Sequence, residues 1–170
     1  MFTGLIQAQG IIQPLGRDRF QIRIPPEQAH SLLKEMVMGD SVAVDGVCLT
    51  VESLLPDGFV ATASPETLAR TTLGSRSEAS TYVNIEPSLQ VGAKLGGHFV
   101  TGHVDEIAKI AEIDKDDENW VVKVKCPHKF RQYIAPKGSV TLNGVSLTVN
   151  DVADDIFLLN IIPHTLKQTN

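Results

Sequence analysis

The sequence predicts an all-β protein made of two small tandem Greek-key β-barrels that are related by internal duplication. The first observation is a repeat: residues 39–51 (GDSVAVDGVCLTV) and 137–149 (KGSVTLNGVSLTV) are identical at seven of thirteen positions, at a constant offset of 98 residues. The second is a series of short alternating segments, separated by turn residues and accompanied by only brief helical patterns. The period is too long for a solenoid unit, so the repeat indicates two copies of one domain.

The repeat divides the chain of 170 residues into three parts: a barrel over residues 1–87, a linker over 88–97 and a barrel over 98–170. The offset aligns Asn170 with Thr72. The second barrel is therefore expected to be truncated at its C-terminus, without a counterpart of the strand predicted at residues 82–86.

Local patterns predict the elements of the first copy. Apolar and polar residues alternate in residues 20–24, as in a strand with one buried face. Asp45-Gly46 is a strong hairpin signal, and apolar residues at helical spacing predict a helix over residues 27–38. Ser64 and Pro65 predict a capped helical turn. Strands are expected at residues 1–12, 20–24, 41–44, 47–54, 59–63 and 82–86.

The second copy repeats this plan. Asn143-Gly144 takes the place of the first hairpin turn, and Pro163 begins a second capped turn. The other expected elements are strands near residues 99–104, at 120–126 and at 156–161, and a short helix near 128–133. The paired glycines Gly96-Gly97 do not open a helix after a strand, so no dinucleotide or P-loop fingerprint is present.

Charge and composition exclude several classes of function. The formal net charge is -5, which provides no basic field for nucleic acid. No run is long and apolar enough to span a bilayer, and no signal peptide is recognised, so a cytoplasmic protein is expected. The two cysteines lack the spacing of a zinc or redox site, and no metal is expected.

Cys48 is the first candidate for chemistry, because it follows a tight turn on a strand of Val, Leu and Thr. It could serve as a nucleophile or weak acid, and the alternative is a small buried cysteine that only packs. Residues two apart on a strand share a face, so Cys48 lies with Thr50, and Ser146 with Thr148. We expect both pairs to point inward, where a ligand in each copy would offset the cost of buried polar groups.

Two histidines in the stretch 97–103 are the second candidate. Their odd spacing puts His98 and His103 on opposite faces of a regular strand, which disfavours a shared metal. His103 is expected to act as a general acid or base or to orient the ligand, whereas for His98 function and a solvated linker position are equally open. His30, His128 and His164 lie in helical or turn contexts that favour structural roles.

Eight segments in order resemble the α chain of riboflavin synthase over essentially the whole chain: MFTGLI, GVCLTV, PETLARTTLG, LGGHFVTGHVD, ENWVVKV, YIAPKGSV, NGVSLTVNDV and IPHTL. The resemblance implies two similar six-stranded Greek-key barrels, each holding one 6,7-dimethyl-8-ribityllumazine. The family's reaction moves a four-carbon unit between two lumazines, giving riboflavin and 5-amino-6-(ribitylamino)pyrimidinedione, as the last step of riboflavin biosynthesis. It implies a homotrimer without metal or organic cofactor, and lumazine synthase is a further candidate partner.

The resemblance also carries site residues onto this chain. It implies catalytic roles for Cys48, His103 and Ser146. It implies ligand contacts in the first copy at Gly4, Leu5, Ile6, Ser41, Cys48, Leu49, Thr50, Thr62, Ala63, Ser64, Pro65, Glu66 and Thr67. In the second copy it implies contacts at Gly102, His103, Val104, Lys137, Ser146, Leu147, Thr148, Asn160, Ile161, Ile162, Pro163, His164 and Thr165.

Two alternatives and two departures accompany the resemblance. The lumazine proteins of luminous bacteria bind the pteridine without turnover, but they depart from the CLT and GGH...GH motifs that are intact here; a general flavin-binding scaffold is the other alternative. Asn143 stands where many members have Asp, and the family's C-terminal helix is absent from these residues. We therefore expect a weaker oligomer than the trimer, in which Lys137 loses a contact shared across subunits and turnover is impaired.

Overall fold

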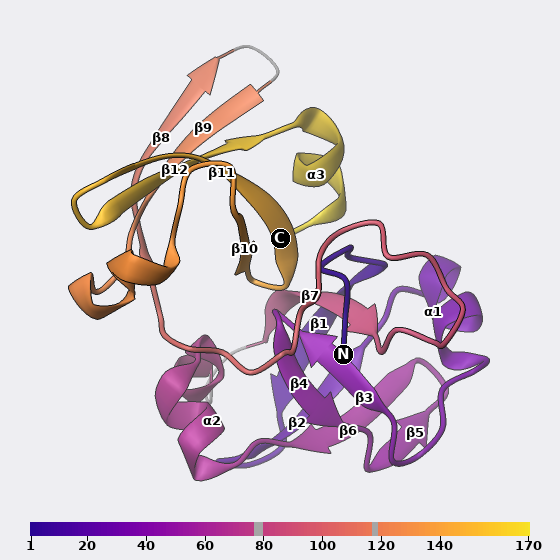
Figure 1. Cartoon of the computed structure of the whole chain (residues 1–170). Coiled ribbons are helices and arrows are strands. Elements are labelled where there is room, and N and C mark those ends of the chain that lie inside the picture. The colour runs from indigo at the N-terminus through magenta and orange to yellow at the C-terminus, as the bar shows by residue number, and fades with distance from the viewer. Residues whose placement is uncertain (77–79, 117–118) are drawn as a thin grey trace.

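The computed structural model describes residues 1–76, 80–116 and 119–170. These residues form two bodies of antiparallel strands, with the first half of the chain in one and the second half in the other (Figure 1). The described helices are short, and none of them is long and apolar enough to cross a membrane. The architecture agrees with the all-β tandem duplication that the sequence predicts.

The first body is a closed barrel. Its sheet order is β4-β3-β7-β1-β2-β6-β5, with β4 and β5 at the two ends. These two are successive parts of one bent strand, so the sheet closes on itself with six strands. The strands are β1 (Ala8–Pro14), β2 (Arg19–Arg23), β3 (Ser41–Val44), β4 (Val47–Thr50), β5 (Ser53–Leu55), β6 (Gly58–Thr62) and β7 (Thr81–Pro87).

Short helices and a continuous apolar core complete this barrel. The helices are α1 (Pro26–Leu33), α2 (Pro65–Arg70) and the 3-10 helix η1 (Thr72–Arg76). Asp45 and Gly46 have φ angles of 48° and 78°, which is the conformation of the type I′ turn expected between β3 and β4. Phe20, Phe59 and Ile85 are fully buried at 0% exposure in the core that the strands enclose.

The second body has the sheet order β10-β11-β12-β9-β8. Its elements are β8 (Lys109–Asp116), β9 (Asn119–Lys125), the 3-10 helix η2 (His128–Tyr133), β10 (Ser139–Leu142), β11 (Val145–Ala153), β12 (Ile156–Ile161) and α3 (Pro163–Gln168). In the first body β7 pairs with both β3 and β1. No strand among the described residues joins β10 to β8 in this way, as expected from the alignment of Asn170 with Thr72.

Several local expectations are corrected by the structure. The first helix ends at Leu33 rather than at residue 38, whereas the short helix expected near residues 128–133 is present as a 3-10 helix. Instead of a strand near residues 99–104, only Val100 forms an isolated bridge, because Gly102 turns the backbone with φ 81°. Strand β8 was not expected, since its sequence KIAEIDKD is highly charged and the side chains of residues 109–115 are exposed.

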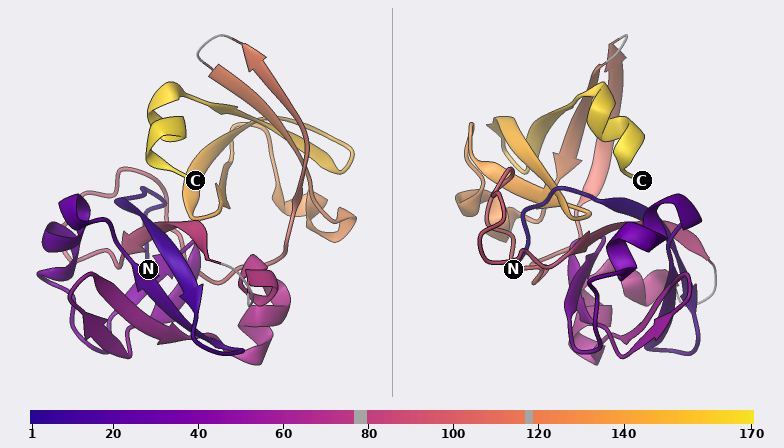
Figure 2. Two further views of the ribbon diagram at one scale, coloured as in Figure 1. Left: turned by 180° about the vertical axis from the view of Figure 1, so that it is seen from behind. Right: turned by 90° about the vertical axis from the view of Figure 1, so that its right-hand side faces the viewer.

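The two bodies meet through residues that are equivalent in the repeat. Phe2 and Val100, which are 98 positions apart, form an antiparallel bridge with hydrogen bonds of 2.7 Å and 3.0 Å between their N–H and carbonyl groups. Gly46 approaches its own equivalent Gly144 so closely that a Cβ on Gly46 would lie 2.7 Å from the Gly144 nitrogen. The contact is therefore locally two-fold, and Figure 2 shows the indigo N-terminal segment passing between the bodies.

Candidate functional site

The strand that carries Cys48 turns its polar residues away from the barrel core. Val47, Leu49 and Val51 are buried in the core, whereas Thr50 is exposed and Cys48 is half-buried. The expectation of inward-pointing polar pairs is wrong. Because strand residues alternate between two faces, the apolar set occupies the core, and Cys48 and Thr50 face outward.

The outward face of each repeat strand is closed by the other copy. The Cys48 N–H donates to the Gly102 carbonyl at 2.8 Å, and the Ser146 N–H donates to the Gly4 carbonyl at 2.7 Å. These two hydrogen bonds are equivalent under the offset of 98 residues. Each candidate strand therefore pairs with the N-terminal segment of the other copy.

Only glycine fits at the two crossing points. Gly4 and Gly102 have φ angles of +77° and +81°, a region that side chains rarely adopt. A Cβ on Gly4 would lie 2.6 Å from the Ser146 Cβ, and a Cβ on Gly102 would lie 2.7 Å from the Cys48 Cβ. The glycines of the motifs TGLI and TGHV thus allow the backbone of one copy to lie directly on the candidate strand of the other.

This crossing changes how the predicted ligand residues group. Gly4 lies beside Ser146, and the Ile6 Cδ1 atom lies within 3.4 Å of the Cβ position of Gly144, so the segment 4–6 belongs with the second copy's strand. The segment 102–104 belongs with Cys48 by the same reasoning. The resemblance grouped segment 4–6 with the first copy's positions and segment 102–104 with the second's, whereas in the structure each segment lies against the other copy's strand.

The remaining predicted positions are divided between core and surface. Leu49 and Ala63 are buried in the core of the first barrel, and Ile161 packs against the core of the second body. Ser64 caps α2, where its Oγ accepts from the Thr67 N–H at 3.1 Å. Its equivalent in the second copy is Ile162, which offers no such cap to α3. The exposed predicted residues beside the two repeat strands are Thr62, Ser64, Pro65, Glu66, Asn160, Ile162 and His164.

Two further predicted residues stand at the beginning of the hairpins. Ser41 is paired with Thr50 across the β3–β4 hairpin, so it lies beside the Cys48 strand. Lys137 is exposed and has φ 66°, at the position where the first copy has Gly39 with φ 94°. Its N–H donates to the Val149 carbonyl at 2.7 Å, as Gly39 does to Val51 at 2.8 Å.

His98 contacts the second repeat strand directly. Its Nδ1 is joined to the Ser146 Oγ by a hydrogen bond of 2.7 Å, and its Nε2 is joined to the Thr141 Oγ1 at 3.0 Å. Burial lowers the pKa of the His98 imidazole below its ordinary value, which favours the neutral ring near pH 7. Sequence reasoning left His98 undecided, because its partners lie more than forty residues away and carry no local signal.

His103 has different surroundings. It is exposed, and its backbone N–H donates to the Thr101 Oγ1 at 3.2 Å. It follows Gly102 directly and so lies next to the backbone contact with Cys48. The expected placement on opposite faces of a regular strand does not apply, because residues 98–103 form no strand. No group of three potential metal ligands occurs within the described ranges.

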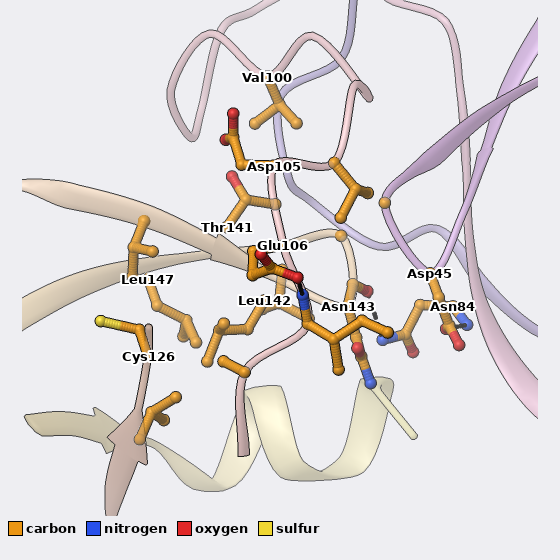
Figure 3. A pocket seen from close by; sticks show the side chains of 18 of the residues that line it. Asp45, Asn84, Val100, Asp105, Glu106, Cys126, Thr141, Leu142, Asn143 and Leu147 are labelled. Atoms are coloured by element: carbon orange, nitrogen blue, oxygen red, sulfur yellow. Dashed lines mark hydrogen bonds between the residues drawn. The ribbon is translucent and has the colours of Figure 1, made fainter. Parts of the chain in front are cut away.

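A cavity of about 740 Å³ lies against the inner side of the second body and extends to Val47 and Asn84 of the first body. Leu147, Cys126, Thr141 and Leu142 line it, and at one end the Asn143 carbonyl accepts from the Asn84 side-chain amide at 2.9 Å (Figure 3). Cys48, Thr50, Ser146 and Thr148 do not line it. In the first barrel Val83 and Ile85 of β7 are buried in the core. The predicted site residues that do line the cavity are Gly102, His103, Val104, Leu147, Ile161 and Thr165.

Comparisons with known proteins agree with this architecture. The lumazine binding domain family matches residues 3–88 and 101–170. Riboflavin synthase of Actinobacillus pleuropneumoniae is 40% identical, that of Photobacterium leiognathi 38% and that of Bacillus subtilis 33%. The alignments cover 100%, 100% and 99% of this chain and 78% of each relative.

Solved structures are similar over the whole chain as well. LumP in complex with 6,7-dimethyl-8-(1'-D-ribityl) lumazine has a TM-score of 0.85 at 25% identity, and LumP in complex with riboflavin has 0.83 at 26%. Each alignment covers 100% of this chain and 91% of the other. With two lumazine binding domains and full-length similarity to curated enzymes, the chain belongs to the riboflavin synthase family.

Proposed function

We propose that this chain is a riboflavin synthase that converts two molecules of 6,7-dimethyl-8-ribityllumazine into riboflavin and 5-amino-6-(ribitylamino)pyrimidinedione. The observation that carries the proposal is the pair of equivalent outer strands, one with Cys48 and one with Ser146, each closed by a glycine carbonyl of the other copy. A dismutation needs two sites of nearly the same shape that differ in chemistry. The duplication provides the shape, and the exchange of Cys for Ser provides the difference.

The two sites are assigned different groups for the transfer. A base must remove a proton from the acidic 7-methyl group of the donor lumazine, and a nucleophile must add at C7 of the acceptor. We assign the base to His103 and the nucleophile or proton relay to Cys48. At the second site the Ser146 hydroxyl has the His98 ring at 2.7 Å, and a neutral imidazole can accept a proton there.

A binding protein without turnover is the second candidate. The observation that favours it is the structural similarity to LumP, which was crystallised with lumazine, riboflavin and flavin mononucleotide. Such a protein needs the barrels and the outer strands but not the reacting groups. The intact Cys48 and His103 favour the enzyme.

A fluorescence assay separates the two candidates. Purified protein is incubated with 6,7-dimethyl-8-ribityllumazine, and binding and riboflavin formation are followed in the same sample. We expect riboflavin and the pyrimidinedione in equal amounts. Lumazine that binds tightly and is recovered unchanged would instead identify a binding protein. Light scattering on the same preparation tests the expected homo-oligomer.

A further inference from the structure

We propose that Glu86, a residue of the first barrel, is the positioning residue for Ser146 at the second copy's site. This inference builds on the proposed function, because it concerns one of the two lumazine sites proposed there. Glu86 lies on β7 and is 2% exposed. It is not among the residues that the sequence pattern singles out.

The Glu86 carboxylate holds the N-terminal segment with three hydrogen bonds. Its Oε1 accepts from the Thr3 N–H at 2.7 Å and from the Thr3 hydroxyl at 2.6 Å, and its Oε2 accepts from the Gly4 N–H at 2.9 Å. All three bonds are buried. A carboxylate only accepts, so both oxygens match the donors that they face, and such bonds are stronger than those between neutral groups.

The segment held by Glu86 reaches Ser146 by two routes. On the first route the Gly4 carbonyl accepts from the Ser146 N–H at 2.7 Å. On the second the Thr3 carbonyl accepts from the His98 N–H at 3.0 Å, and the His98 ring is bonded to the Ser146 hydroxyl at 2.7 Å. Both the backbone and the side chain of Ser146 are thus fixed through the two residues that Glu86 binds.

The equivalent contact at Cys48 is built differently. Thr101 is the counterpart of Thr3, but Thr101 is exposed whereas Thr3 is 6% exposed. The Thr101 hydroxyl accepts from the His103 N–H, and the three hydrogen bonds of the Glu86 carboxylate all go to Thr3 and Gly4. Loss of the Glu86 carboxylate is therefore expected to disturb Ser146 and to leave Cys48 in place.

Glu86→Gln tests this selectivity, because an amide of the same shape puts an N–H₂ group against donors that need an acceptor. Hydrogen exchange of two backbone amides is the first measurement. We expect the Ser146 amide, bonded to Gly4, to exchange at least about tenfold faster, while the Cys48 amide, bonded to Gly102, changes less than about twofold. Glu86→Asp, which keeps the carboxylate on a shorter chain, is expected to restore part of the protection.

Lumazine binding is the second measurement. We expect Glu86→Gln to lower the number of 6,7-dimethyl-8-ribityllumazine molecules bound per chain from two to one and to reduce riboflavin formation by about tenfold or more. Glu52→Gln is the matched control, since Glu52 is a partly exposed carboxylate that pairs with Arg19 at 3.6 Å, and it is expected to behave like the wild type.

Three outcomes would overturn the proposal. Equal acceleration at Ser146 and Cys48 would mean that Glu86 only stabilises the whole fold, and no acceleration at either amide would mean that it positions nothing. If the Ser146 amide exchanges faster but two lumazines still bind and turnover is unchanged, Glu86 holds the Ser146 backbone without affecting the lumazine site. If the wild type binds no lumazine, the proposed function fails, whereas the exchange measurement still tests the role of Glu86 in holding Ser146.

Discussion

The Ser146 N–H donates to the Gly4 carbonyl at 2.7 Å, although the two residues lie in different copies of the repeat. This hydrogen bond and its counterpart between Cys48 and Gly102 place one copy's backbone directly on the other copy's candidate strand. The two candidate sites are therefore shared between the copies, and changes at the crossing points are expected to affect both packing and activity.

Gly102→Ala is expected to lower the unfolding free energy by about 3 kcal/mol and to impair turnover, because the new Cβ meets the Cys48 Cβ at 2.7 Å in a left-handed backbone. Gly92→Ala is the control: Gly92 also has a positive φ, of +92°, but nothing lies within 4 Å of its Cβ position. That variant is expected to cost about 1 kcal/mol, from the backbone alone. Thermal unfolding of both proteins measures the difference, and equal losses would show that the close contact with Cys48 is unimportant.

Cys48→Ser is expected to reduce riboflavin formation by about tenfold or more, while lumazine still binds. The change is nearly isosteric and converts the first copy's residue into that of the second, Ser146. Cys126→Ser is the comparison, because Cys126 is buried in the second body and burial raises the pKa of its thiol. Turnover and lumazine titration of both variants show whether the Cys48 thiol takes part in the reaction or only packs. A Cys48→Ser protein with wild-type turnover would mean that it only packs.

His98 is expected to make the protein less stable as the pH falls below the ordinary histidine pKa of about 6.5. Burial lowers the pKa of His98 in the folded chain, so the unfolded chain takes up a proton first. The stability is thus fully present above the ordinary pKa and is lost progressively as the pH falls toward the folded value. Melting temperatures from pH 5 to 8 should depend less on pH in His98→Gln than in the wild type.

His30→Gln is the control for that series, since His30 is an exposed residue of α1. It is expected to retain the pH dependence of the wild type. The same slope in His98→Gln and the wild type would show that His98 does not titrate differently in the two states. NMR titration of the imidazole signals gives the direction of the shift independently.

Lys137→Gly is expected to leave the melting temperature nearly unchanged, because relief of the left-handed backbone at φ 66° offsets the flexibility that glycine adds to the unfolded chain. The first copy already has Gly39 at this position. Turnover is nevertheless expected to fall by about tenfold, because the resemblance implies that the Lys137 side chain contacts the ligand and the variant lacks its ammonium group. A variant with unchanged turnover would assign Lys137 a purely local role.

Structural elements that depend on a few neighbouring residues could be predicted from the sequence. The β3–β4 hairpin follows from Asp45-Gly46, and the repeat itself gives β10 and β11. Strand β8 could not be found, because its charged side chains are exposed and it is held by pairing with β9 rather than by its own burial.

The sequence suggested candidate residues for the site but not the contacts between them. Val47 and Leu49 alternate with Cys48, and this pattern already indicates that the apolar residues face the core. We had expected the polar residues to face inward instead. The crossing of Gly4 onto Ser146 and the hold of Glu86 on Thr3 join residues from distant parts of the chain. Such contacts cannot be predicted from local sequence patterns, because they depend on how the two copies pack against each other.

The bridge between Phe2 and Val100 has a consequence for how the two copies differ. Residues that meet their own equivalents are what an isologous homodimer uses, and here the chain through residues 88–97 turns that association into an intramolecular contact at a fixed effective concentration. A homodimer must carry the same residue in both halves. Within one chain the two copies are free to diverge. The first copy can therefore have Cys48 and Gly39 at the positions where the second copy has Ser146 and Lys137, while the contact between the copies stays symmetric.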